Sequence, residues 1–377
     1  MIVIKDKENC CGCGACSNVC PKSCIRMQED EEGFLYPIAD SLLCINCGKC
    51  EKVCPVSNPS EAKASEAVFA AKNVSDEARM KSSSGGAFVK LAEMVLQEGG
   101  VVFGACFDNH FEVEHSYVEE TSSLGKLLGS KYVQSKMGDC FQKVKQFLEI
   151  GRKVLFSGTS CQVAGLKSFL GHEFENLIAV DIVCHGVPSP LVWRKYLESL
   201  GARDLSSVSF RNKRDGWTKY RIRICDAIEQ KEVVDECYLD NVFMKGFLKN
   251  FYLRPSCYKC PAKGGRSCSD ITIGDYWGVE KQHPAFFDEK GVSLVLANTE
   301  KGLLMIKNSS LLLVESSYSQ ATQRNACIEK SVFRSPDRDY FWKQFSKQGI
   351  GAIEKTISHA SKPNLIRFVA KRLNKQS

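Results

Sequence analysis

The sequence of 377 residues contains no apolar run long enough to span a membrane, and no leading stretch resembles a signal peptide. It also lacks a large excess of one charge, because 51 basic residues stand against 44 acidic ones and give +7. This mild balance by itself implies neither nucleic-acid binding nor membrane binding. No G-x-G-x-x-G fingerprint follows an expected strand, so a Rossmann nucleotide site is not supported.

Cysteine, by contrast, is abundant, with 20 residues. The run C-x2-C-x2-C-x3-C-P occurs twice near the start of the chain. The first copy contains Cys10, Cys13, Cys16 and Cys20, and the second contains Cys44, Cys47, Cys50 and Cys54. Bacterial-type ferredoxins use this run to hold two 4Fe–4S clusters, with the fourth cysteine of each run binding the other cluster.

This exchange predicts two ligand sets. Cys10, Cys13, Cys16 and Cys54 are expected to hold one cluster, and Cys44, Cys47, Cys50 and Cys20 the second. Zinc has no use for the third cysteine of each run, and disulfides are implausible at this density in a reducing compartment. Because clusters need reduced thiolates, we expect a cytoplasmic protein. Cys11 and Cys24 fall outside the pattern.

The predicted fold is an α+β ferredoxin-like two-cluster domain joined to a larger mixed α/β body. We expect the ferredoxin over residues 1–58, a linker over 59–66, two parts of the body over 67–150 and 151–319, and a helical basic tail over 320–377. Strand, turn and helix alternate between about 101 and 200, which favours a mainly parallel sheet there. After Gly201 the alternation of polar and apolar residues favours antiparallel strands.

Small polar residues lie at the ends of several expected strands. Ser84, Gly85 and Gly86 precede a helix expected over residues 87–97, where they could cradle a phosphate or simply cap the helix. Gly158, Thr159 and Gln162 follow another strand, at the sheet edge where ligands bind in α/β folds. His185 follows a third strand and could donate a proton to a reduced cofactor, although a lone histidine is more often structural.

A second cysteine group lies far along the chain. Cys257 and Cys260 have metal-like spacing, and Cys268 follows eight residues later. Alone they fit a zinc knuckle or half of an iron–sulfur site. Cys161 and Cys184 could complete the site, but each could equally be a buried small hydrophobe.

Separated motifs of the body occur in one characteristic order. They are Ser84-Gly85-Gly86, Gly129-Ser130-Lys131-Tyr132-Val133, the stretches 158–166 and 184–190, Cys257-x2-Cys260 and the stretch 269–278. With these motifs the chain resembles the coenzyme F420 hydrogenase/dehydrogenase beta-subunit family along nearly all its length. One departure is Ser160, where the family usually has proline.

The resemblance implies a flavoprotein that binds FAD and at least one 4Fe–4S cluster in its body. It implies FAD contacts at Ser84, Gly85, Gly86, Ser130, Lys131, Tyr132, Gly158, Thr159 and Gln162. It also implies a third cluster held by Cys161, Cys184, Cys257 and Cys260, with Cys268 as the alternative for one of these ligands.

The leading functional hypothesis is an iron–sulfur flavoprotein oxidoreductase. It would pass electrons between the ferredoxin clusters and FAD, and on to an organic substrate or a deazaflavin-like cofactor, with His185 as the proton donor. A redox partner protein or a small donor or acceptor would complete the reaction. The alternatives are a non-catalytic electron-transfer subunit of a larger complex, a redox enzyme accessory to polysaccharide biosynthesis, and a redox sensor or scaffold without flavin.

Overall fold

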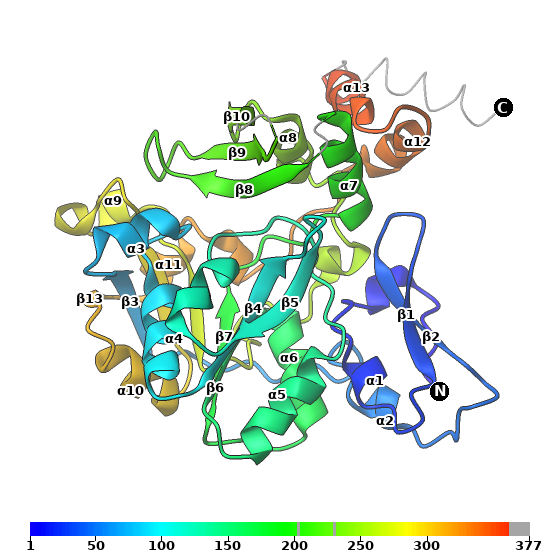
Figure 1. The fold of residues 1–377 in the computed structure, drawn as a ribbon, viewed down its shortest axis with the longest axis horizontal. Helices are drawn as coiled ribbons and strands as arrows, with labels where there is room; N and C mark the ends of the chain where they lie inside the picture. Colours follow the sequence, from blue (N-terminus) through cyan, green and yellow to red (C-terminus); the bar gives the residue numbers. More distant parts are fainter. Residues whose placement is uncertain (202–203, 229–230, 362–377) are drawn as a thin grey trace.

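The computed structural model describes residues 1–201, 204–228 and 231–361. The segment before residue 59 forms a small lobe beside the main body (Figure 1). It contains the antiparallel hairpin of β1 (Ile25–Glu29) and β2 (Leu35–Ala39), with η1 (Lys7–Asn9), α1 (Ala15–Asn18) and α2 (Lys49–Lys52). Gly14 and Gly48 precede α1 and α2 with φ of 75° and 72°, a left-handed conformation that suits glycine. Each cysteine loop can therefore turn directly into a short helix.

Eight strands form the central sheet of the body in the order β13-β3-β12-β11-β7-β6-β4-β5. Their bounds are β3 (Ala67–Lys72), β4 (Val101–Phe107), β5 (Val113–Val118), β6 (Val154–Thr159), β7 (Leu177–Ile182), β11 (Ile271–Asp275), β12 (Ser293–Ala297) and β13 (Leu312–Ser316). The pairs β4–β6, β6–β7 and β7–β11 are parallel, whereas β5, β12, β3 and β13 join antiparallel.

The mixed α/β body is thus confirmed, and pairing within the alternating segment is mainly parallel as expected, whereas the complete sheet is mixed. The strand–helix alternation produces parallel pairing between β4, β6 and β7, as expected. The reason for the difference lies beyond β11, where the chain returns to pair antiparallel in β12. β3, from before the alternating segment, then pairs with β12 and β13 over more than 200 residues of sequence.

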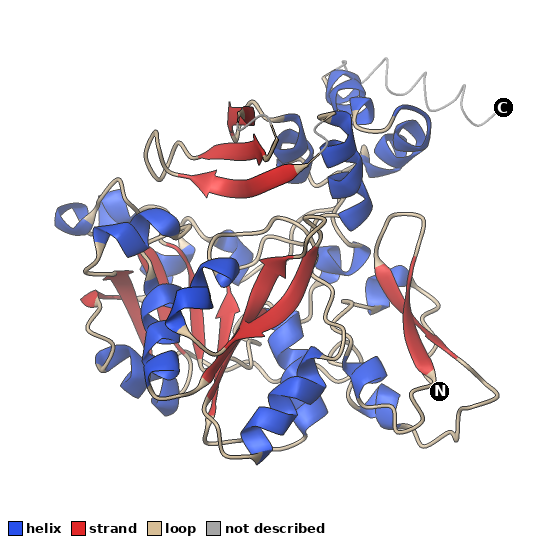
Figure 2. Ribbon diagram, in the orientation of Figure 1, coloured by secondary structure: helices blue, strands red, loops and turns tan. Residues whose placement is uncertain are grey.

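Helices cover both faces of this sheet (Figures 1 and 2). On one face α4 (Ala87–Gln97) buries Leu91 and Val95 in the core that contains Val102. On the other face α5 (Cys140–Glu149) and α6 (Ser160–Leu170) bury Phe141 and Leu166 in the core that contains Phe103. The predicted helix over residues 87–97 is confirmed. The remaining elements of the body near the sheet are α3 (Asp76–Lys81), η2 (Thr121–Leu127), η3 (Pro255–Lys259), α9 (Val279–Gln282), η4 (Pro284–Phe286), α10 (Glu300–Lys307), α11 (Tyr318–Thr322) and η5 (Ala326–Ile328).

A second, smaller sheet lies above the central sheet in Figure 1. It consists of β8 (Leu205–Asn212), β9 (Arg221–Asp226) and β10 (Glu232–Cys237), paired antiparallel as predicted. α7 (Pro190–Ser199), α8 (Val242–Leu248), α12 (Arg338–Gln348) and α13 (Gly351–Ala360) pack with it around an aromatic core that includes Trp193, Phe210 and Phe341. The basic residues Lys371, Arg372 and Lys375 of the predicted tail lie outside the described residues. Among the helices that are described, none is both long and apolar enough to cross a membrane.

The N-terminal lobe is docked tightly on the body. Cys13 and Ala15 belong to the same buried core as Val163 and Leu166 of α6. A Cβ atom added at Gly165 would lie 2.8 Å from the Cys13 sulfur, so glycine is needed there for the close approach. The first cysteine loop therefore lies directly against the helix that carries Cys161.

Candidate functional site

The eight cysteines of the repeated run surround two small cavities in the N-terminal lobe. One cavity is lined by Cys10, Cys13, Cys16 and Cys54. The other is lined by Cys20, Cys44, Cys47 and Cys50. The fold thus brings together the two ligand sets expected from the exchange of the fourth cysteines. Cys24 lies beside the second cavity, with its sulfur 3.3 Å from that of Cys20.

A third cysteine-lined cavity lies between this lobe and the body. It is lined by Cys161 at the start of α6, Cys184 after β7, and Cys257 and Cys260 in and after η3. Cys268 is not among its lining residues, because its sulfur lies 2.6 Å from Ser60 Oγ in a different cavity. The structure therefore brings together the four cysteines favoured as ligands and separates the fifth candidate from them.

The chemistry of this third cavity suits a metal cluster. Burial raises the pKa of Cys257 to about 12 and raises the pKa of Cys184 well above its ordinary value. Such thiols stay protonated unless a metal binds them as thiolates. Among the described residues no three His, Cys, Asp or Glu side chains meet closely enough to hold a single ion. A cubane needs its four thiolates spread around it instead.

A larger cavity of about 270 Å³ adjoins the third cysteine cavity and contains most of the residues expected to contact FAD. Of these it is lined by Ser84, Gly86, Ser130, Lys131, Tyr132, Gly158, Thr159 and Gln162, and also by His185. Gly85 is the exception. A Cβ atom there would lie 2.4 Å from the Ala71 carbonyl oxygen and 2.5 Å from the Ser293 amide nitrogen, so this glycine allows close packing against β3 and β12.

Serine side chains fix the loop at the start of α4. The Ser84 hydroxyl donates to the Val292 carbonyl at 2.8 Å. Ser83 Oγ accepts from the Ser130 amide at 2.7 Å, which ties the two segments expected to contact FAD to each other. Gly86 caps α4 without a side-chain hydrogen bond. The amides of the first helical turn therefore face the cavity beside Ala87, where an anion would be favoured.

Three cations surround this loop, and sequence reasoning named one of them. Lys131 Nζ donates to the Leu128 carbonyl at 2.8 Å, and burial lowers the pKa of Lys131 to about 8. Arg211, which the sequence did not single out, pairs with Asp275 at 2.8 Å and donates to the Ser83 carbonyl at 3.1 Å. Lys213 donates to the Ser84 carbonyl, and burial lowers its pKa to about 7. The available signal was the basic run at residues 211–214, at the end of β8.

His185 lies between the third cysteine cavity and the 270 Å³ cavity and lines both of them. Its Nε2 lies 2.7 Å from Asn250 Oδ1, and the Asn250 amide nitrogen donates to the Phe333 carbonyl at 3.1 Å. Because the amide orientation is fixed in this way, Nε2 carries the proton and Nδ1 is an acceptor. Burial lowers the pKa of His185, which favours the neutral ring.

Three of the cavities share lining residues in series, and the outer cavity of Cys20, Cys44, Cys47 and Cys50 adjoins them through a core that also contains Cys16. Cys11 lines both the Cys10 cavity and the third cysteine cavity. Thr159, Gln162 and Cys184 line both the third cysteine cavity and the cavity beyond it. Redox groups held in them would stand next to one another along one path.

Residues 151–316 match the family described as the C terminus of the coenzyme F420 hydrogenase/dehydrogenase beta subunit, and residues 9–58 match the 4Fe-4S dicluster domain. By the first of these matches the chain is similar to coenzyme F420 hydrogenase/dehydrogenase beta subunits over the C-terminal part of its body. It is an iron–sulfur redox protein related to those beta subunits.

A solved structure of the F420-reducing NiFe hydrogenase complex from Methanosarcina barkeri, obtained by xenon derivatization, contains a chain similar to this one. The two are 15% identical over 79% of this chain and 93% of that chain, with a TM-score of 0.47. No curated protein matches the chain.

One residue at the third cysteine cavity departs from the pattern usual in the F420 hydrogenase/dehydrogenase beta-subunit family. Ser160 occupies the first position of α6, after a capping box formed by Thr159 and Gln162. Its hydroxyl donates to Asp181, a contact that proline could not make. Proline is favoured at this helix position, so the departure concerns the side-chain contact and leaves the turn intact.

Proposed function

We propose that the protein is an iron–sulfur flavoprotein that passes electrons along three 4Fe–4S clusters to FAD, and from FAD to an organic substrate or a deazaflavin-like cofactor. The observation that carries this proposal is the succession of neighbouring cavities, three lined by cysteines and one lined by Lys131 and by polar side chains. Clusters carry single electrons and a flavin carries one or two, so the order suits a conversion between them.

The residues of the last cavity suit part of an FAD. The N-terminal amides of α4 and the ammonium of Lys131, which lines the cavity, would offset the charge of its phosphates. Arg211 and Lys213 do not line the cavity and would act by holding the Ser83-Ser84 loop through its carbonyls. Its volume of about 270 Å³ is slightly below the roughly 300–1,000 Å³ of typical small-molecule sites. It would therefore enclose only part of the cofactor, with the remainder in its open mouth. The role of proton donor expected for His185 suits its surroundings poorly, because its Nε2–H is bound to Asn250 and burial favours the neutral ring. We propose instead that His185 accepts a hydrogen bond or a proton at Nδ1.

Anaerobic purification with iron, sulfide and flavin counted per chain tests this proposal. We expect about twelve iron atoms and one flavin per chain. About eight iron atoms with stoichiometric zinc would contradict the third cluster, and absence of a flavin band would contradict the flavin site.

Lys131 offers a test of the flavin site. Lys131→Ala is expected to weaken FAD binding about tenfold, since a hydrogen bond to a charged group contributes roughly 1.5 kcal/mol. The ammonium form is present below its pKa of about 8, so affinity in the unaltered protein should fall as pH rises through 8. FAD titration of flavin-depleted protein between pH 7 and 9 measures both effects. Exposed Lys126→Ala is the control, and equal losses in the two variants would contradict a local role.

Replacing Cys47 tests whether the outer cluster site, formed by Cys20, Cys44, Cys47 and Cys50, is independent of the flavin site. Cys47 is the one exposed cysteine of the 20, all of which are described. Cys47→Ala is expected to lower iron from about twelve to about eight atoms per chain while flavin remains bound. Cys13→Ala, at the contact with α6, should in addition lower thermal stability. Loss of flavin from Cys47→Ala protein would show that the outer cluster and the flavin site are not independent.

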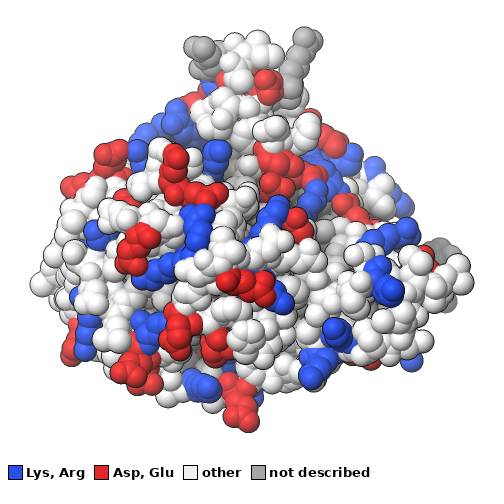
Figure 3. Space-filling model, turned by 60° about the horizontal axis from the view of Figure 1, so that its bottom comes forward, with Lys and Arg blue, Asp and Glu red and all other residues white. Residues whose placement is uncertain are grey.

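The outer cysteine loop also suits a redox partner protein. Leu42 is 94% exposed, and Leu43 and Ile45 are each 57% exposed beside Cys47. The nearby Lys22, Lys49 and Lys52 carry positive charge at or near this surface. Figure 3 shows mainly basic side chains among uncharged ones toward the right, where the lobe lies in Figure 1. Small apolar patches with a charged rim fit the brief encounters of electron-transfer proteins.

Leu42→Glu is therefore expected to slow electron exchange with a small acidic ferredoxin at least fivefold, because it removes apolar contact and adds repulsion. Stopped-flow reduction by such a ferredoxin measures the rate. Reduction by dithionite should be unchanged, and Leu312→Glu, at an exposed leucine on β13, serves as the control. Identical rates in both variants would place the partner elsewhere.

A further inference from the structure

One face of the central sheet is left uncovered by helices between two cores. α5 and α6 cover it on one side, and a core that contains Tyr276 and Ala321 covers it on the other. Between them lie β7 and β11, where Asp181 and Thr272 are register partners. A cavity of about 860 Å³ opens there, much larger than the flavin cavity.

The floor of this cavity is unusually polar for a sheet face. Asp181 is fully buried and accepts hydrogen bonds from Ser267 at 2.8 Å, from Ser269 at 2.7 Å and from Ser160. The Asn298 amide donates to Thr272 Oγ1 at 2.8 Å and to Ser269 Oγ at 3.0 Å.

Nothing in the described part of the chain compensates the buried carboxylate with charge, since no lysine, arginine or histidine there lies within ion-pairing distance of Asp181. Burying such a group without a cation is costly, and the three hydroxyl donors offset only part of that cost. A network of hydroxyl and amide groups at the base of a large cavity is instead typical of a site that hydrogen-bonds a ligand.

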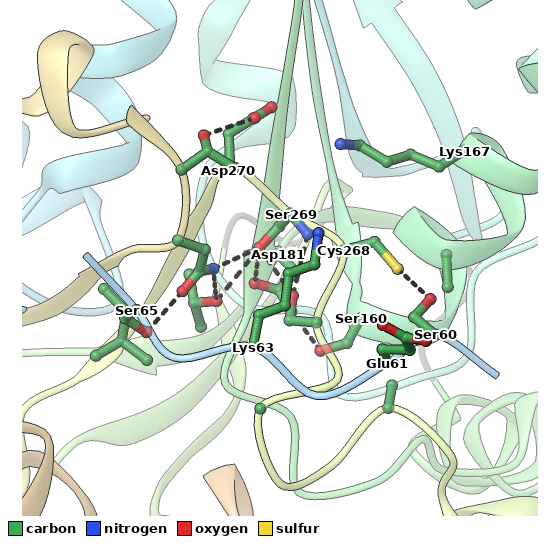
Figure 4. A pocket seen from close by; sticks show the side chains of 18 of the residues that line it. Ser60, Glu61, Lys63, Ser65, Ser160, Lys167, Asp181, Cys268, Ser269 and Asp270 are labelled. Carbon is green, nitrogen blue, oxygen red and sulfur yellow. Dashed lines mark hydrogen bonds between the residues drawn. The ribbon is translucent and has the colours of Figure 1, made fainter. Parts of the chain in front are cut away.

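The charged lining of the cavity consists of four lysines and of carboxylates that include Glu61, Glu173 and Glu175. Lys263 and Lys301 are bonded to backbone carbonyls, which leaves Lys63 and Lys167 as the two ammonium groups that a ligand could reach. Lys63 on the linker and Lys167 on α6 point into the space above Asp181 from different walls (Figure 4). Lys167 pairs with exposed Glu173 at 3.1 Å, a contact that a ligand can replace. Lys63 forms no ion pair with any described residue. The linker itself is held in place, since the Lys63 amide donates to the Gly265 carbonyl at 2.8 Å.

We propose that this cavity binds a hydroxylated phosphate ester, such as a sugar phosphate or a nucleotide. Its hydroxyl groups would meet the Asp181 floor, and its phosphate would lie between Lys63 and Lys167. The site adjoins the 270 Å³ cavity, with which it shares Ile182, Val183 and Cys184, and Ser160 and Cys184 also line the third cysteine cavity. A bound ligand would therefore lie next to that cluster site, and its binding does not depend on the proposed flavin.

Calorimetric titration of the purified holoprotein tests the proposal, with ribose 5-phosphate and AMP as probes and ribose and inorganic phosphate as comparisons. At least one phosphorylated probe is expected to bind, at least tenfold more tightly than either comparison compound. If neither probe binds, the proposal is wrong.

Two variants locate the binding. Lys63→Ala combined with Lys167→Ala should weaken binding of the probe at least tenfold, whereas Lys307→Ala, at an exposed lysine, should leave the affinity unchanged. Ser267→Ala removes a floor hydroxyl that donates to Asp181 at 2.8 Å and does not line the third cysteine cavity, so it should weaken binding while iron and flavin contents stay unchanged. Unchanged affinity in both the lysine and the Ser267 variants would place the probe elsewhere and overturn the proposal. Iron and flavin counts on the same samples report separately on the redox proposal.

Discussion

Cys257→Ala protein is expected to contain about eight iron atoms per chain instead of about twelve, and to reduce its flavin slowly or not at all from the ferredoxin end. Cys257 lies in the third cysteine cavity, between the Cys10 cavity and the flavin cavity. Losing a cluster there would interrupt the path while both ferredoxin clusters remain. Anaerobic iron analysis and stopped-flow flavin absorbance measure the two effects.

Cys268→Ala is the matched control, because Cys268 faces Ser60 in a separate cavity. It should keep about twelve iron atoms. Cys161 would be a poorer choice for the test, since Cys11 lines the same cavity and could replace it as a ligand. The ligand assignment would be contradicted if Cys268→Ala lost four iron atoms and Cys257→Ala lost none.

Arg254→Gln is expected to lower both the reduction potential of the inner ferredoxin cluster and the stability of the protein. Arg254 is fully buried and donates to the Cys10 carbonyl at 2.7 Å, to Gln134 at 2.9 Å and to the Leu35 carbonyl at 2.9 Å. Its guanidinium also lies 3.5 Å from the Cys10 sulfur. A positive charge beside a ligand sulfur favours the reduced cluster, and its removal should shift the potential downward.

The same substitution leaves buried carbonyl groups without a donor, at a cost of about 1–3 kcal/mol. Arg254→Lys separates the two effects, because it keeps the charge but loses the forked geometry. The Arg254→Lys variant should keep a cluster reduction potential close to that of the unaltered protein, but it should unfold at a lower temperature. EPR-monitored redox titration and thermal unfolding measure these outcomes. An unchanged potential in Arg254→Gln would mean that the charge does not act on the cluster.

The strongest sequence patterns were local. The spacing of the cysteines predicted which of them would line each cavity, because a run of three fixes one loop and a fourth residue must come from the other. The helix over 87–97 was equally predictable, since Gly86 and Gly99 bound an apolar pattern. The strand order of the central sheet was less predictable, because the pairing of β3 with β12 and β13 depends on contacts across most of the chain.

Residues that act over long sequence distances were missed for the same reason. Arg254 reaches a carbonyl 244 residues away in Cys10, and Arg211 reaches Ser83 across 128 residues. Nothing adjacent to either arginine indicates these partners. Gly85 is the opposite case, because its motif suggested a contact with phosphate. In the structure this glycine instead allows close packing against β3. A Gly85→Asp variant would disturb the sheet and would not be a clean test of flavin binding.

The central claim is that three clusters and one flavin share a single path, and a coulometric titration of the anaerobic protein tests it most directly. Each 4Fe–4S cluster accepts one electron and the flavin accepts two, so the account predicts about five electrons per chain, with cluster and flavin signals both changing. An uptake of only about two electrons, confined to the ferredoxin clusters, would contradict the account.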